Sequence, residues 1–134
     1  MPLEVDLVLA SGSPRRQQLL ASLGLSPRVM PSGVDETLFP GESAFDGAER
    51  LAREKAADVV ARVGPEPLVV AADTLVVLDG RPLGKPRDRR EAREMLGALS
   101  DRTHDVVTGV AVAREGRLVS SRDVTLVTFG PLSA

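Results

Sequence analysis

The chain has 134 residues, 43% of them apolar and 27% charged, which is the size and composition of one globular domain with its own core. It has no cysteine, which excludes disulfides and thiolate chemistry, and no apolar run approaches the about 20 residues that span a bilayer. A net charge of −2 and the absence of Trp and Tyr argue against a nucleic-acid-binding module, which needs a basic excess and aromatic stacking platforms.

The first elements expected along the chain are a strand, a helix and a second strand. Residues 5–10 are a short apolar run with β-branched side chains, typical of a buried strand. Ser13 is a favourable N-cap and Pro14 a favourable first helical residue, so a helix is expected to begin there. Gly24 fits the position just after the end of that helix. A second strand is expected at 28–30.

The middle of the chain predicts a loop, a long helix and a long strand. Residues 31–43 are rich in Pro, Gly and acid, as loops are. Residues 44–63 carry an apolar stripe at helical spacing and predict the longest helix. Residues 68–78 are an apolar run, interrupted only by Asp73 and Thr74, and predict a strand. The helical stripe consists of Ala52, Ala56, Val59, Val60 and Val63.

The last part of the chain predicts a hairpin arm, a third helix and a second hairpin. Residues 79–84 read as a turn and a returning arm. Asp88 with Glu91 three residues later forms a capping-box pattern at a helix start. Strands are expected at 104–113 and 118–129. The apolar face of the helix consists of Ala92, Met95, Leu96 and Leu99. Hairpins interleaved with crossover helices predict an α/β fold with a mixed sheet.

The turn SGSPRR at residues 11–16 is the first candidate site. A strand that opens into a helix leaves backbone N–H groups free, and the positive end of the helix dipole adds to them. Ser11, Ser13, Arg15 and Arg16 therefore make a suitable place for an anion such as phosphate. The alternative is a plain Ser-Pro helix start with two solvated arginines, and the turn alone does not decide between them.

Two carboxylates are the next candidates. Asp73 lies inside an apolar strand, where an ionised carboxylate is costly unless it is paired, hydrogen-bonded or bound to a metal. The alternative is an aspartate that binds a nearby backbone N–H. Glu36 lies in the acidic loop and is either a metal ligand or a solvated acid. Together the two carboxylates could hold a hard divalent cation such as magnesium.

Lysine is rare in this chain, which makes its two occurrences informative. Of the 17 basic residues only Lys55 and Lys85 are lysine, and lysine offers a compact point charge on a flexible stem. Each has an ordinary alternative: Lys55 beside the helical stripe could extend to water, and Lys85 could be an exposed turn residue.

His104, the one histidine, is expected to make a structural hydrogen bond. Cations around carboxylates, without a Ser/His nucleophile pair, indicate phosphoanhydride chemistry with water as nucleophile.

At these residues the sequence resembles the Maf family of nucleoside triphosphate pyrophosphatases. Six blocks occur in the family's order and spacing, and they extend from the first strand to the end of the chain. They are LASGSPRR at 9–16, VDE at 34–36, REKA at 53–56, AADTLVVLDGRPLGKP at 71–86, MLGALSDRTHDVVTGVAV at 95–112 and VTFGPLS at 127–133.

The resemblance implies hydrolysis of the α–β bond of a nucleoside triphosphate, with a divalent cation, Mg²⁺ or Mn²⁺, as cofactor. It implies that Asp73 is the general base or a metal-associated acid and that Glu36 is a metal ligand. Thr74 and Arg15 place the chain in the branch that acts on dTTP and UTP. The substrate-binding set would be Ser11, Ser13, Arg15, Arg16, Lys55, Thr74 and Lys85.

The implied fold is an elongated mixed β-sheet flanked by helices, similar to the ITPase fold, with a cleft between two lobes and often a homodimeric assembly. Family sequences continue past PLS, so we expect residues 1–134 to be a single Maf-like domain without the family's C-terminal segment. The strand at 118–129 would then be an exposed edge that favours dimerisation or aggregation. The start of the chain has no basic flank of a signal peptide, so a cytoplasmic protein is expected. The alternative function is a non-catalytic nucleotide-binding or regulatory protein linked to septum formation.

Overall fold

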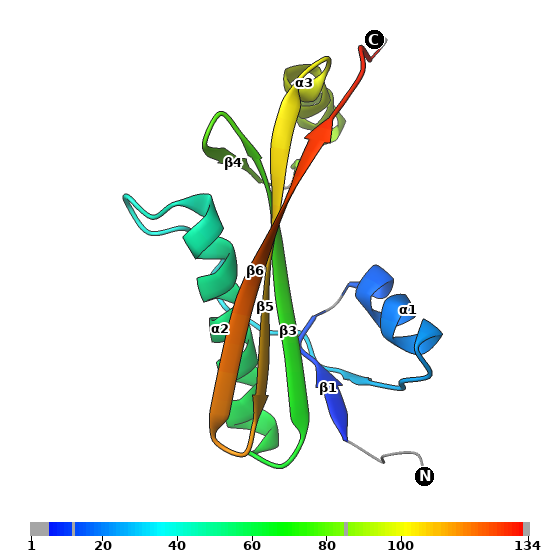
Figure 1. Cartoon of the computed structure of the whole chain (residues 1–134), viewed down its shortest axis with the longest axis vertical. Helices are drawn as coiled ribbons and strands as arrows, with labels where there is room; N and C mark the ends of the chain where they lie inside the picture. The colour runs from blue at the N-terminus through cyan, green and yellow to red at the C-terminus, as the bar shows by residue number, and fades with distance from the viewer. Residues whose placement is uncertain (1–5, 12, 85, 133–134) are drawn as a thin grey trace.

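The computed structural model describes residues 6–11, 13–84 and 86–132 and contains a six-stranded sheet with three helices (Figure 1). The expected order of strands and helices is confirmed, and two of the elements, α2 and β3, have the expected bounds. The elements are β1 (Leu7–Leu9), α1 (Pro14–Ser22), β2 (Arg28–Val29), α2 (Ala44–Val63), β3 (Leu68–Leu78), β4 (Arg81–Leu83), α3 (Arg89–Leu99), β5 (Thr103–Arg114) and β6 (Arg117–Thr128).

The sheet is mixed, with the order β2-β1-β3-β5-β6. Strand β1 is parallel to both β2 and β3, because α1 and α2 provide the crossovers that parallel neighbours need. Strands β3, β5 and β6 are antiparallel and run along most of the molecule, as Figure 1 shows. Strand β4 turns back against the far end of β3. Strand β3 is continuous as predicted, and its pairing with β5 runs through Asp73 and Thr74.

One edge of β3 has a gap that positions the candidate site. On this edge β1 pairs with β3 as far as Val70, and β4 begins to pair at Val76. Between them no strand of the described residues pairs with β3 on this side. Asp73 and Thr74 lie in the middle of this gap, so a ligand could approach them without displacing a strand.

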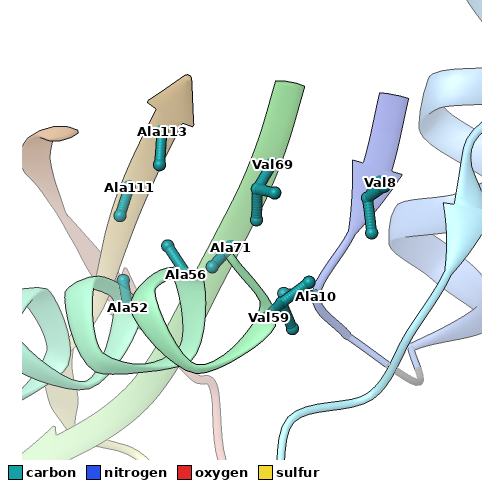
Figure 2. Packing of buried hydrophobic residues seen from close by; sticks show 9 residues of the cluster. All are labelled: Val8, Ala10, Ala52, Ala56, Val59, Val69, Ala71, Ala111 and Ala113. Atoms are coloured by element: carbon teal, nitrogen blue, oxygen red, sulfur yellow. The ribbon is translucent and has the colours of Figure 1, made fainter. Parts of the chain in front are cut away.

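The core lies between α2 and one face of the sheet. Figure 2 shows Ala52, Ala56 and Val59 of α2 facing the small side chains of β3 and β5. At Gly109 of β5 an added Cβ would lie 2.3 Å from the carbonyl oxygen of Ala48, so glycine is required for this close approach. The cluster comprises Val8, Ala10, Ala52, Ala56, Val59, Val69, Ala71, Ala111 and Ala113. Because side chains alternate along a strand, Asp73 shares this face whereas Thr74 points to the other one.

One expectation about packing is met in part and another is wrong. Of the apolar face predicted for α3, Leu99 is buried, Ala92 and Met95 are half-buried and Leu96 is exposed, because α3 lies at the end of the sheet away from the main core (Figure 1). His104 is buried, but its Nδ1 has no hydrogen-bond partner within the residues that the structure describes. The ring packs edge-on against Phe129 instead, with 5.0 Å between the ring centroids. Apolar burial has therefore replaced the expected hydrogen bond.

The outer strand β6 is an edge of the sheet, as predicted. Within the described part of the chain it pairs only with β5, and Val119 and Leu126 are exposed on it. Among the helices of this part, none is both long enough and apolar enough to cross a membrane.

Candidate functional site

The candidate site is centred on the side chain of Lys55, which extends from α2 over β3. Its Nζ lies 2.8 Å from Oδ1 of Asp73 and 2.8 Å from Oε1 of Glu36. The side chains of Lys55 and Asp73 are only 12% and 9% exposed, whereas that of Glu36 is 55% exposed. Lys55 therefore does not extend to water, and one ammonium joins the two carboxylates that the sequence singled out.

The charges of this cluster stabilise one another. Burial lowers the pKa of Lys55, but hydrogen bonds and attraction from Asp73 and Glu36 outweigh this effect, and the net pKa lies above its ordinary value. The ammonium is thus kept charged at neutral pH. The second oxygen of Asp73, Oδ2, is buried and has no hydrogen-bond partner among the described residues. Such an oxygen can bind a cation or accept from a donor on a ligand once a side-chain movement exposes it.

A second group of side chains lies on the opposite face of β3. Arg16 donates from Nη1 to Oγ of Ser11 and from Nη2 to Oγ1 of Thr74, both at 3.1 Å. Thr74 in turn shares a hydrogen bond of 3.1 Å with Oγ1 of Thr108, its register partner on β5. Ser13 caps α1 as predicted, accepting from the backbone N–H of Arg16. No signal in the sequence pointed to Thr108, because only the register between β3 and β5 places it beside Thr74.

The two groups meet at the gap in the edge of β3. Helix α2, with Lys55, lies on one side of the long strands and α1, with Arg16, on the other (Figure 1). Because no strand of the described residues flanks β3 here, both faces can be reached from the same edge. The structure therefore places Glu36, Lys55 and Asp73 in one group and Ser11, Arg16 and Thr74 in another, on the two faces of β3 at neighbouring positions.

Of the two remaining predicted residues, the structure describes only Arg15. It is exposed on α1 beside Arg16, and Lys85 lies outside the described residues. Two cavities, of about 280 and 450 Å³, lie near the C-terminal end of α2, and neither is lined by a predicted site residue. The expected cleft thus does not correspond to either of these cavities.

The donor set fits a hard divalent cation. Within the described residues no group of three or more His, Asp or Glu side chains could hold a metal. Mg²⁺ is usually held by one or two carboxylates, with waters and substrate phosphates completing its shell. Glu36 and the unpartnered Oδ2 of Asp73 provide such a partial set.

Comparison with known proteins decides the family. Residues 6–134 match the family model described as Maf-like protein. The chain belongs to the Maf family. Among curated Maf relatives, the chain is 46% identical over 127 residues to a dTTP/UTP pyrophosphatase of Halalkalibacterium halodurans, covering 95% of the chain and 66% of that protein. It is 47% identical over 128 residues to a dTTP/UTP pyrophosphatase of Escherichia coli strain K12, covering 96% of the chain and 65% of that protein. The chain thus spans just under two thirds of the length of these relatives.

Solved structures confirm the fold. A structure described as nucleoside-triphosphatase / dITP/XTP pyrophosphatase from Mycobacterium abscessus superposes with a TM-score of 0.60 at 19% identity, covering 92% of the chain and 74% of that protein. The Ham1 protein of Staphylococcus aureus gives a TM-score of 0.61 at 16% identity, covering 90% and 70%. The expected ITPase-like α/β architecture is therefore correct.

Proposed function

We propose that the protein hydrolyses nucleoside triphosphates, above all dTTP and UTP, to the monophosphate and pyrophosphate with the help of a divalent cation. The observation that carries this proposal is the buried Lys55–Asp73 ion pair, joined by Glu36, at the open edge of β3. Carboxylates for a cation thus lie beside cations for phosphate. The names of the Maf relatives, dTTP/UTP pyrophosphatase, support the same activity.

Each side chain has a role that follows from its contacts. Lys55 binds Oδ1 of Asp73, which leaves Oδ2 as the oxygen that meets a cation or takes the proton of an attacking water. Glu36, more exposed, supplies a second carboxylate to the cation. A bound Mg²⁺ or Mn²⁺ would neutralise phosphate charge and acidify water. Arg15, Arg16 and, after adjustment, Lys55 would offset the charge of the triphosphate, with Lys85 as the fourth cation.

The preference for dTTP and UTP is proposed to depend on Thr74 and Arg15. The hydroxyl of Thr74 is held between Arg16 and Thr108, so it is oriented before a nucleotide binds. Preorganised hydrogen-bonding groups of this kind discriminate between substrates because a wrong partner leaves them unpaired.

Pyrophosphate release tests the proposal directly. The chain is incubated with dTTP, UTP or a purine triphosphate, each with Mg²⁺ or Mn²⁺, and product is quantified with and without a chelator. Asp73→Asn should lower kcat at least about 100-fold, the scale of a lost general base. Asp101→Asn is the matched control, because Asp101 is exposed in a distant turn with a positive φ that asparagine tolerates.

The outcomes separate the alternatives. Metal-dependent product from the wild type that disappears in Asp73→Asn supports the proposal. Full activity in Asp73→Asn refutes the role of Asp73. Nucleotide binding without any product supports the non-catalytic alternative.

A further inference from the structure

The loop that carries Glu36 is held by side chains more than by its own backbone. Within residues 31–43 of the described chain one backbone–backbone hydrogen bond joins two loop residues, from the N–H of Glu42 to the carbonyl of Phe39. A loop with so few main-chain bonds has its shape determined by contacts with its surroundings. The position of Glu36 therefore depends on what holds the loop.

Arg50 of α2 makes several of these contacts. Its Nε and Nη2 donate to the two carboxylate oxygens of Glu42 at 2.7 and 2.9 Å, which is the paired geometry of a guanidinium and a carboxylate. Nη2 also donates to the carbonyl oxygen of Thr37 at 3.1 Å. The guanidinium carbon lies 3.8 Å from the centre of the Phe39 ring, and Nη1 pairs with Glu54 of the same helix. One mostly buried cation thus binds three residues of the loop.

The bond to Thr37 matters for Glu36, which precedes it. The backbone N–H and hydroxyl of Thr37 both donate to the carboxylate of Asp35, at 2.9 and 2.7 Å. Glu36 therefore lies between two residues whose conformation is set, one of them held to α2 by Arg50. Its carboxylate meets Lys55 five residues further along the same helix.

We propose that Arg50 is a positioning residue for the cation-binding carboxylates: it fixes the loop backbone at Thr37 so that Glu36 lies opposite Asp73. The proposal rests on the proposed function, because it takes Glu36 as a ligand of the cation. Lysine cannot replace Arg50, since an ammonium lacks the planar fork that binds Glu42 and Thr37 together and does not stack as well on Phe39.

Arg62 provides a matched control. It lies on the same helix and also binds the loop, donating to the carbonyl of Pro31 at 3.0 Å and pairing with Asp58. Pro31 is at the start of the loop, five residues before Glu36. If any weakening of the loop disturbed the cation site, substitutions at both arginines would act alike.

The experiment measures binding of Mn²⁺ alone, by electron paramagnetic resonance and calorimetry, to the folded chain. Arg50→Lys is expected to weaken Mn²⁺ binding about 10-fold, as loss of an outer partner of a metal ligand does. Arg62→Lys should stay within about two-fold of the wild type on the same scale. In a Glu36→Gln background, Arg50→Lys should have no further effect, which a merely structural role would not produce. Glu42→Gln, which removes one side of the same fork, is the second variant if Arg50→Lys folds poorly.

One result would refute this inference but not the proposed function. In it, Glu36→Gln lowers the affinity for Mn²⁺, whereas Arg50→Lys and Glu42→Gln do not. Equal losses from Arg50→Lys with and without Glu36 also overturn it. If Glu36→Gln binds Mn²⁺ like the wild type, the cation site of the proposed function fails, and the inference fails with it.

Discussion

Replacing Lys55 by methionine removes the charge of the ammonium and keeps most of the length of the side chain. Asp73 is then a buried carboxylate without its partner, because Oδ2 has none among the described residues. Removing one partner of a buried ion pair costs about 3–5 kcal/mol, whereas exposed pairs contribute about 1 kcal/mol or less. Since Glu36 is half-exposed and the methionine still packs, we expect a loss of about 3 kcal/mol, dominated by Asp73.

Thermal and urea unfolding at neutral pH measure this loss. For a chain of this size 1 kcal/mol corresponds to about 3–5 °C, so Tm should fall by about 10–15 °C. Asp73→Asn in the Lys55→Met background should restore part of the stability, with a coupling free energy of about 2 kcal/mol between the two positions. If the two single losses simply add in the double variant, the ion pair is not what stabilises this part of the molecule.

The pH dependence of the same variant supplies a second check. Because the folded pKa of Lys55 is raised, its stabilisation is fully present below the pKa of lysine in the unfolded chain. That stabilisation is lost only as pH rises through the higher folded value. The difference in the free energy of unfolding between wild type and Lys55→Met should therefore be constant from neutral pH to about pH 10 and become smaller at more alkaline pH. A difference that already disappears by about pH 8 would contradict the reasoning.

Two further predictions concern packing and acid stability. Gly109→Ala should destabilise the protein by about 1–3 kcal/mol in urea unfolding, because the new Cβ meets the backbone of Ala48. Gly97→Ala, in helix α3 with open space around it, should instead stabilise by about 0.5–1 kcal/mol, and equal effects would refute the packing argument. Hydrogen bonds from Ser120 and Arg122 lower the pKa of Glu49, so its stabilisation is present above the ordinary glutamate pKa and lost as pH falls through the lower folded value. Glu49→Gln should therefore flatten the acid side of the stability profile between about pH 5 and 3, measured by urea unfolding, and an unchanged profile would contradict the assignment.

Much of the architecture follows from local signals. The Ser13-Pro14 helix start, the bounds of α2 and the turns between hairpin strands were all predicted, because caps, apolar periodicity and turn residues act over a few neighbouring positions. The predicted apolar face of α3 shows the limit of such signals. A stripe identifies the side of a helix that can be buried, but whether anything covers it depends on the rest of the fold.

The candidate site divides in the same way. Asp73 could be singled out because a charge in an apolar strand needs an explanation, and Lys55 because lysine is rare in this chain. Only the structure shows that these two side chains form an ion pair, since they come from different elements and lie 18 residues apart in the sequence. Thr108 and Arg50 gave no comparable signal. The first depends on strand register, and the second on a loop that folds back along α2.

Local patterns by themselves determined the class of fold and the residue types of a phosphate-binding site, and the resemblance of six sequence blocks indicated the Maf family. Tertiary structure decided which charges are paired and where the site opens. It placed Lys55 between two carboxylates and left Oδ2 of Asp73 without a hydrogen-bond partner in the described part of the chain. The pairing of β1 with β3 also ends at Val70, so the edge of β3 beside Asp73 is open. The physical reason is that burial and pairing are properties of surfaces that meet only after folding, whereas caps and periodicity belong to the chain before it folds.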